Sequence, residues 1–126
     1  MSKLLFAALL LLASRCDECQ CNEQNTITLR GYLLEIHCAD IQREASLRII
    51  HGKGCLGRQS DDLSFQIFDL RTRRYWQIDR WANEALMPWA VMLESRVNVL
   101  ISIRGFADEK HKLISPCGLR PVGTYE

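Results

Sequence analysis

Short stretches of alternating hydrophobic and polar residues predict several β-strands in this chain. Residues 97–103 carry valine or isoleucine at every second position, and residues 63–67 alternate in the same way. The polar turn 71–74 separates the second stretch from residues 75–78, which are rich in aromatic and β-branched side chains. Because a strand turns successive side chains to opposite faces, we predict a half-buried strand over residues 97–103 and a hairpin over residues 63–78.

The first half of the chain gives more varied patterns. Residues 26–36 are rich in β-branched and hydrophobic side chains and predict a strand with a bend or bulge at Gly31. Residues 39–50 fit both helical and strand spacing, so both structures stay open for them. Three glycines and two aspartates within residues 51–62 predict a long loop.

A change to helical spacing in residues 80–94 predicts one or two short helices, interrupted or restarted at Pro88. Residues 105–112 then form a turn, and residues 113–114 return as a strand. The hydrophobic residues that share one face of the predicted helices are Trp81, Ala85, Trp89, Met92 and Leu93. Successive short strands with one helical insertion predict a mainly β protein that forms a small closed or partly open barrel.

The composition is that of one globular domain. Of the 126 residues, 48% are hydrophobic and 25% are charged, which provides enough apolar surface for one core and argues against disorder. The formal net charge of +1 produces no overall field that would attract nucleic acid. No nucleic-acid partner is therefore expected.

The N-terminus has the pattern of a secretory signal peptide. Residues 1–3 contain a lysine, and the nine residues 4–12 are all apolar. Nine residues are too few to cross a bilayer as a helix, which needs about 20. The small residues Ala13 and Ser14 follow where cleavage occurs, so residues 1–15 predict export. The alternative is a buried N-terminal helix.

Cys16 gives the exported chain a second way to be processed. The leucine-rich segment that ends at Cys16 resembles a bacterial lipoprotein signal, although Arg15 stands where a small residue is expected. A lipid on Cys16 would attach the protein to a membrane. Without residues 1–15 the chain keeps 14 basic and 15 acidic residues, so the exported protein is nearly neutral.

Six cysteines follow the predicted signal peptide, and in a small exported domain they indicate disulfides before metal ligands. They are Cys16, Cys19, Cys21, Cys38, Cys55 and Cys117. We predict one bridge between Cys38 and Cys55 and another between Cys117 and the N-terminal group, with Cys21 as its partner. The polar segment 16–25 would then be an anchored arm, and residues 116–126 a C-terminal tail.

Three segments resemble a group of small exported bacterial proteins with an OB-like barrel. They are GYLLEIHCA at residues 31–39, HGKGCL at residues 51–56, and the strand V-x-V-x-I-x-I-x-G at residues 97–105. The resemblance implies an OB-like five-stranded barrel over residues 26–115, with one or two short helices and stabilised by disulfides. The chain lacks the further cysteine that the group often carries after the loop, and the resemblance implies no activity.

Cations and aromatic residues are interleaved near the predicted hairpin turn. The candidate contact residues are Arg71, Arg73, Arg74, Trp76 and Arg80. On an OB-like barrel, such a face would stack sugar rings while arginine holds sulfate, phosphate or carboxylate groups. For an exported protein this favours an anionic glycan or another envelope or extracellular partner. The alternative is a solvated turn, with Trp76 and Trp81 packed in the core.

A second candidate site combines imidazole and thiol groups. His37, Cys38, His51 and Cys55 would suit a soft metal such as copper or zinc if the cysteines were reduced. The alternative is the Cys38–Cys55 disulfide, in which a histidine caps the loop. Disulfide exchange by the N-terminal cysteines is disfavoured, because the neighbouring acidic residues raise the pKa of their thiols.

No pattern in the sequence forms a catalytic motif. Asp61 with Asp62, and Asp108 with Glu109, are adjacent pairs in predicted turns, where both carboxylates normally face water. The spacing of a nucleophile elbow is also absent. We therefore expect a non-enzymatic exported binding module without a cofactor. The alternatives are a Cys/His metal-binding or redox protein and an inhibitor that docks on a secreted enzyme.

Overall fold

The computed structural model describes residues 25–42, 48–59, 61–95 and 98–125. Its strands are β1 (Thr26–Glu35), β2 (Ala39–Gln42), β3 (Arg48–His51), β4 (Phe65–Asp69), β5 (Arg74–Ile78), β6 (Asn98–Asp108) and β7 (Leu113–Tyr125). Its helices are α2 (Cys55–Arg58) and α3 (Asn83–Ala90), with 3₁₀ turns η1 (Arg80–Ala82) and η2 (Val91–Ser95). The predicted signal peptide lies outside the described residues. Within these ranges, no helix has the length and hydropathy needed to span a membrane.

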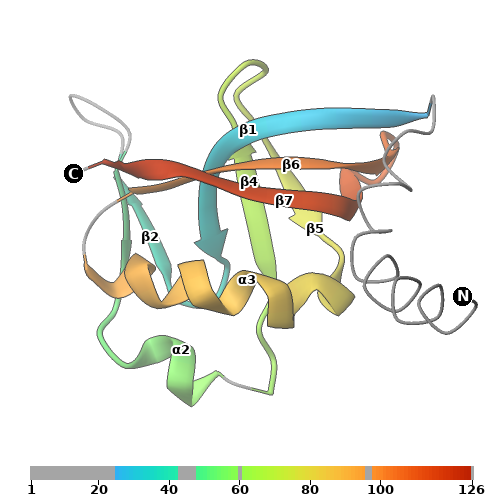
Figure 1. Cartoon of the computed structure of the whole chain (residues 1–126). Helices are drawn as coiled ribbons and strands as arrows, with labels where there is room; N and C mark the ends of the chain where they lie inside the picture. The colour runs from blue at the N-terminus through green and yellow to red at the C-terminus, as the bar shows by residue number, and fades with distance from the viewer. Residues whose placement is uncertain (1–24, 43–47, 60, 96–97, 126) are drawn as a thin grey trace, which may run out of the picture.

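Five strands form a barrel in the order β1-β4-β5-β7-β6, which closes because β1 also pairs with β6 (Figure 1). All neighbours run antiparallel except β5 and β7, which are parallel. The connection from β5 to β6 carries η1, α3 and η2. This arrangement is that of the OB fold, a five-stranded Greek-key barrel. The prediction of a mainly β, OB-like five-stranded barrel with short helices is confirmed.

Strand β1 links the two halves of the barrel because it changes partner midway. Residues 26–32 pair with β6, whereas residues 31–35 pair with β4. The change falls at Gly31, where the sequence predicted a bend, and Figure 1 shows β1 curving along its length. At this point the backbone of Phe68 approaches so closely that a side chain on residue 31 would have no room.

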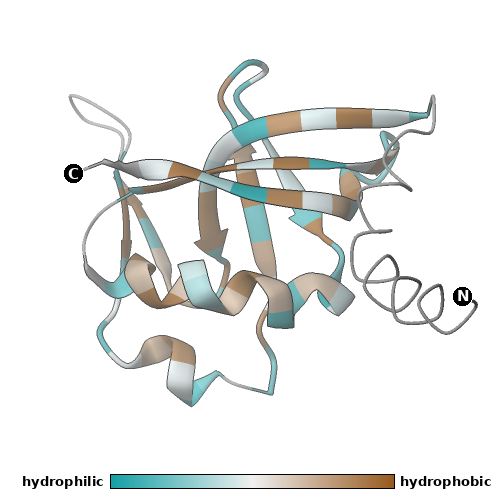
Figure 2. Ribbon diagram, in the orientation of Figure 1, coloured by the Kyte–Doolittle hydropathy of each residue, from teal (hydrophilic) through white to brown (hydrophobic). Residues whose placement is uncertain are grey.

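The barrel interior and α3 share one hydrophobic core. Strand residues alternate between hydrophobic and hydrophilic (Figure 2), and the inward ones include the fully buried Phe65, Ile67, Ile78, Ile101, Ile103 and Ile114. Helix α3 lies across one end of the barrel and buries Leu86 and Ala90 (Figure 1).

The predicted hydrophobic face of the helical segment is wrong for several of its residues. Leu93 is buried as predicted, but Trp81 is 63% exposed and Met92 is 41% exposed. The segment is not one regular helix, because 3₁₀ turns precede and follow α3. A 3₁₀ turn has three residues per turn, so it shifts the helical phase that the prediction assumed.

The ambiguous residues 39–50 contain β2 and β3, which pair as a separate two-stranded sheet. Ile49 of β3 packs with Leu34 and Phe68 in a small second hydrophobic cluster. The predicted long loop over residues 51–62 contains the short helix α2. The two-stranded sheet of β2 and β3, together with α2, therefore forms a subdomain at one side of the barrel.

The predicted C-terminal tail, residues 116–126, is corrected by the structure, in which β7 continues to Tyr125. Prolines and glycines give this segment the composition of a loop. However, the two register shifts between β6 and β7 fall next to Pro116 and Pro121. A β-bulge leaves one residue unpaired, so it accommodates a proline that lacks an N–H group. The barrel domain therefore extends past residue 115.

Candidate functional site

The turn between β4 and β5 carries most of the arginines predicted as a binding face. The carboxylate of Asp69, which is 2% exposed, accepts hydrogen bonds from the Thr72 N–H at 3.1 Å and the Thr72 hydroxyl at 2.6 Å. The Asp69 carbonyl accepts the Arg73 N–H at 2.7 Å, and Arg73 has a left-handed φ of 60°. These bonds fix the turn, so the neighbouring side chains project from a rigid frame.

A cleft of about 350 Å³ opens beside this turn. It lies between the first half of β1, the β4–β5 hairpin and the turn from β6 to β7. The structure brings three of the predicted contact residues together in its lining, namely Arg71, Arg74 and Trp76. Glu109 and Lys112 of the β6–β7 turn complete its charged wall.

Positive charge in the cleft is only partly compensated. Lys112 donates hydrogen bonds to the carbonyl oxygen of Glu109 at 3.0 Å and to its carboxylate at 3.1 Å. The Asp69 carboxylate is held by Thr72. The guanidinium groups of Arg71 and Arg74 have no ion pair or hydrogen bond with any other described residue. Both are therefore available to an anion that enters the cleft.

Trp76 forms part of the cleft wall rather than an open stacking platform. Its side chain is 4% exposed and belongs to the barrel core. The ammonium group of Lys112 lies 5.2 Å from the centroid of its ring, at cation–π distance. A ligand in the cleft would therefore meet Lys112 before it met the face of the indole.

The other two predicted contact residues lie elsewhere. The Arg73 guanidinium lies 5.5 Å from the centroid of the Phe68 ring, and Arg73 does not line the cleft. Arg80 is at the start of η1, where its guanidinium lies 3.5 Å from the carboxylate of Asp62. The predicted face is thus divided, and only Arg71, Arg74 and Trp76 line one site.

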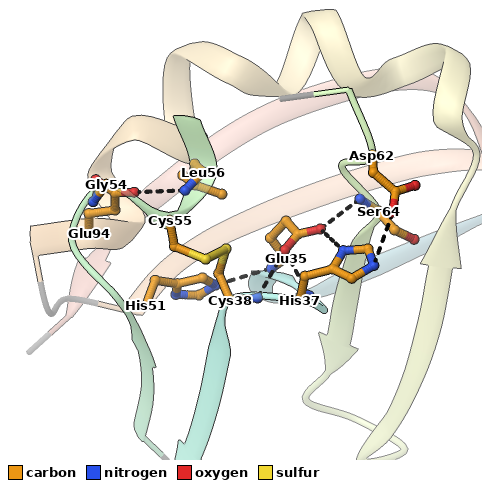
Figure 3. Close-up of a disulfide and its surroundings, with 10 residues drawn as sticks. All are labelled: Glu35, His37, Cys38, His51, Gly54, Cys55, Leu56, Asp62, Ser64 and Glu94. Atoms are coloured by element: carbon orange, nitrogen blue, oxygen red, sulfur yellow. Dashed lines mark hydrogen bonds and ion pairs between the residues drawn. A yellow bond between two sulfur atoms is a disulfide. The ribbon is translucent and has the colours of Figure 1, made fainter. Parts of the chain in front are cut away.

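A separate cluster surrounds the buried carboxylate of Glu35 at the end of β1 (Figure 3). One carboxylate oxygen accepts the backbone N–H groups of His37 at 2.8 Å and Cys38 at 3.0 Å. The other accepts the Ser64 N–H and the His37 ring Nδ1–H, both at 2.8 Å. The Glu35 side chain is fully buried, and these four hydrogen bonds replace the water that its charge has lost.

His37 lies between two carboxylates, since its Nε2 is 3.6 Å from Asp62 (Figure 3). The hydrogen bond to Glu35 is the main cause that raises the pKa of His37 above its usual value of 6.5. The negative charges of Glu35 and Asp62 act in the same direction. Protonated His37 therefore stabilises the fold below pH 6.5, and this contribution is lost as the pH rises through the raised pKa.

The predicted disulfide between Cys38 and Cys55 is confirmed, with Cα atoms 5.8 Å apart. Cys117 is also disulfide-bonded. Its predicted partner Cys21 lies outside the described residues, as does Cys16, the predicted site of lipidation.

The alternative of a metal site at His37, Cys38, His51 and Cys55 does not fit this oxidised state, because a disulfide offers no thiolate. His51 is 2% exposed, and its Nε2 accepts the Glu35 N–H at 3.1 Å. Burial lowers the pKa of His51, which keeps the ring neutral. Across the described ranges, no three His, Cys, Asp or Glu side chains are placed so that they could hold one metal ion.

Glu94 holds the disulfide loop against the helical segment. Its carboxylate accepts the N–H groups of Gly54 and Leu56, both at 3.0 Å, at the start of α2 (Figure 3). The hydrogen bond from Gly54 is the largest cause that lowers the pKa of Glu94. The loop is thus tied at Cys55 to Cys38, in the turn between β1 and β2, and at Gly54 to η2.

Replacing Cys38 and Cys55 together with alanine is expected to lower the free energy of unfolding by about 3 kcal/mol. The bridge spans 17 residues, and its removal frees this loop in the unfolded chain. Urea denaturation followed by circular dichroism measures the loss. A loss below about 1 kcal/mol would contradict this expectation, because the bridge would then restrict the unfolded chain much less than its loop length implies.

Two important residues were missed at the level of the sequence. Lys112 lines the cleft although it lies 36 positions after Trp76, and no local pattern connects the two. The sequence did contain an indication of the role of Glu35, since Glu35 is the single acidic residue in the hydrophobic strand of residues 26–36. A carboxylate in such a strand is either exposed or held by donors, and here donors hold it.

The fold and the cleft together define an OB-like barrel with a basic cleft beside its β4–β5 hairpin. The chain has no significant match among protein-family models, curated proteins or solved structures.

Proposed function

We propose that this protein is an exported, non-enzymatic binding module that holds an anionic glycan of the cell envelope in the cleft. The observation that most supports this is the pair Arg71 and Arg74, which line the cleft without a partner among the described residues. In OB folds, the second and third barrel strands and the loop between the fourth and fifth bind oligosaccharides or oligonucleotides. The corresponding parts here are β4, β5 and the β6–β7 turn, an argument by analogy of fold.

Export favours a glycan over nucleic acid as the ligand. The apolar run at residues 4–12 is typical of a signal peptide, and the Cys38–Cys55 disulfide is compatible with an oxidising compartment. In this proposal the mature protein is secreted or periplasmic, and a lipid on Cys16 would attach it to the envelope. The resemblance to small exported bacterial OB-like proteins supports the same location.

Replacing Arg71 and Arg74 together with glutamine is expected to weaken binding of a heparin oligosaccharide at least about tenfold, because two charge-assisted contacts are lost. Isothermal titration calorimetry at low and at higher salt measures the affinity. Salt should weaken binding less in the variant, since fewer ionic contacts remain to be screened. A neutral dextran of similar length tests whether the charge of the ligand is needed.

The matched control replaces Arg73 and Arg80 with glutamine. It removes the same charge, but Arg73 lies over Phe68 and Arg80 pairs with Asp62, so binding should change little. Equal losses in both double variants would mean that heparin is attracted only by overall charge. Equal binding of dextran and heparin would also contradict the proposal, because the cleft would then not select an anion.

A further inference from the structure

A second basic hollow lies on the outer face of the barrel, away from the cleft of the proposed function. There β1, β6 and β7 are neighbouring strands, and their register places Arg30 opposite Ser102 and Ser102 opposite Arg120. These three residues line a hollow of about 330 Å³ together with Pro121 and Val122. A row of arginine, serine and arginine therefore crosses three paired strands.

The hollow is shaped by an irregularity in β7. The partner of Leu100 is Gly123 and the partner of Ile101 is Pro121, so Val122 is an extra residue without a partner in the ladder. A bulge of this kind bends its strand and turns neighbouring side chains to new directions. The side chains that line the hollow are thus presented by paired strands and not by a loop, which keeps their spacing fixed.

The lining of this hollow contains two cations and no carboxylate. Arg30 and Arg120 are both exposed, and neither side chain has an ion pair or hydrogen bond with any residue in the described ranges. By contrast, Lys112 is paired with Glu109 and Arg80 with Asp62. Two unpaired guanidinium groups in one row, on the strands to either side of β6, repel each other unless an anion lies between them.

Geometry and hydrogen-bonding capacity indicate a small, doubly charged oxyanion. Neighbouring strands are about 4.8 Å apart, so the backbones at Arg30 and Arg120 are about 10 Å apart with Ser102 between them. Both guanidinium groups can reach inward over the serine and donate two hydrogen bonds each, and the hydroxyl donates one more. Arg104, two residues along β6 from Ser102, adds positive charge nearby and also donates a hydrogen bond to Thr26 at 3.2 Å.

We propose that this hollow binds one phosphate or sulfate group, either as the free ion or as an ester on a larger molecule. Arg30 and Arg120 clamp the oxyanion from both sides, and the Ser102 hydroxyl donates to one of its oxygens. The site is independent of the cleft at Arg71 and Arg74, so each site can be tested without the other.

The test is calorimetric titration of the full chain with sodium sulfate, inorganic phosphate and methyl phosphate at constant ionic strength. It is done at about pH 7.5, where a phosphate monoester is a dianion. One ion bound by this hollow is expected per chain, and the titration is repeated with the Arg71→Gln, Arg74→Gln variant so that an ion held in the cleft does not contribute. Arg30→Gln with Arg120→Gln should weaken binding at least about tenfold, and Ser102→Ala about fivefold, since it removes a single hydrogen bond.

Two control variants separate this site from the general charge of the protein and from the cleft. Arg48→Gln with Lys53→Gln removes two exposed cations from the β3 region, and Arg71→Gln with Arg74→Gln removes those of the cleft. The first should bind sulfate as the unaltered chain does, and the second should keep the one ion that the hollow binds. Methyl phosphate binding as tightly as inorganic phosphate would identify the ligand as an ester on a larger molecule, whereas weaker binding would identify the free ion.

Three results would overturn the proposal. The first is the absence of sulfate and phosphate binding to the unaltered chain, and the second is unchanged binding in the Arg30→Gln, Arg120→Gln variant. The third is acetate binding as tightly as sulfate, because a singly charged planar ion would not need two guanidinium groups. Loss of heparin binding in the Arg71→Gln, Arg74→Gln variant has no bearing on sulfate binding by the hollow. The proposal for the cleft and the proposal for the hollow can therefore be contradicted separately.

Discussion

Replacing Glu35 with alanine is expected to lower the free energy of unfolding by about 4 kcal/mol. The fully buried carboxylate accepts the backbone N–H groups of His37, Cys38 and Ser64. Alanine would leave these three donors without an acceptor, and each unsatisfied donor costs about 1–3 kcal/mol when buried. Because two of the donors are only partly buried, water recovers some of the loss. Chemical denaturation of the purified protein measures the difference.

Glu94→Ala is the matched control for this prediction. Glu94 also accepts two backbone N–H groups, but it is not buried in the core, so its replacement should cost about 1 kcal/mol. An NMR titration of the Glu35→Ala variant provides a second measurement, in which the pKa of His37 should fall toward 6.5 because its main hydrogen-bond partner is gone. Equal stability of the Glu35→Ala and Glu94→Ala variants would contradict the prediction that the buried carboxylate of Glu35 stabilises the fold. An unchanged His37 pKa would contradict its hydrogen bond to Glu35.

Gly31→Ala is expected to destabilise the barrel by about 4 kcal/mol, or to prevent folding. A β-carbon on residue 31 would overlap the carbonyl oxygen of Phe68 and lie 2.6 Å from its carbonyl carbon. Both atoms belong to the backbone of β4, so no side-chain rotation relieves the clash. The pair of strands would have to separate where β1 changes partner, which breaks ladder hydrogen bonds on that side.

Gly57→Ala is the control for the glycine variant. Gly57 lies in α2, and a β-carbon there would meet no atom within 4 Å beyond its chain neighbours and the backbone of its own helix. Alanine favours a helix over glycine, so this variant should be as stable as the unaltered chain or more stable by up to about 1 kcal/mol. Thermal denaturation of both variants compares them directly. A similar melting temperature for Gly31→Ala and Gly57→Ala would contradict the close approach of β1 and β4.

The fold was predictable from the sequence where each strand has one face in the core. Residues 63–67 and 99–103 alternate because their inner side chains fill the barrel, and a period of two is visible without knowing their partners. Residues 39–50 were ambiguous because β2 and β3 form a small separate sheet whose contacts lie mostly with each other. The end of β7 was missed because bulges allow strand pairing for a segment with the composition of a loop.

The binding face was predicted less well than the fold, for a reason of geometry. Arg71, Arg73 and Arg74 are neighbours in sequence, but the left-handed backbone at Arg73 turns its side chain toward Phe68 while the other two line the cleft. The cluster of basic and aromatic residues therefore indicated the correct hairpin, but it could not show which of these side chains line the same cleft. The positions of Lys112 and Arg120 depend on strand pairings that no local pattern contains.

The pairing of β1 with β6 affects how fast this protein folds and in which order its strands can pair. Thr26 pairs with Phe106, so the seam that closes the barrel joins residues 80 positions apart. Folding rates fall as contacting residues become more distant in sequence, and β-barrels of this kind commonly fold in milliseconds to seconds. The barrel cannot close until both β6 and β7 are in place, because β7 joins β6 to β5. Until β6 is in place, β1 has only β4 as a barrel partner, and the edge of β1 that pairs with β6 stays open.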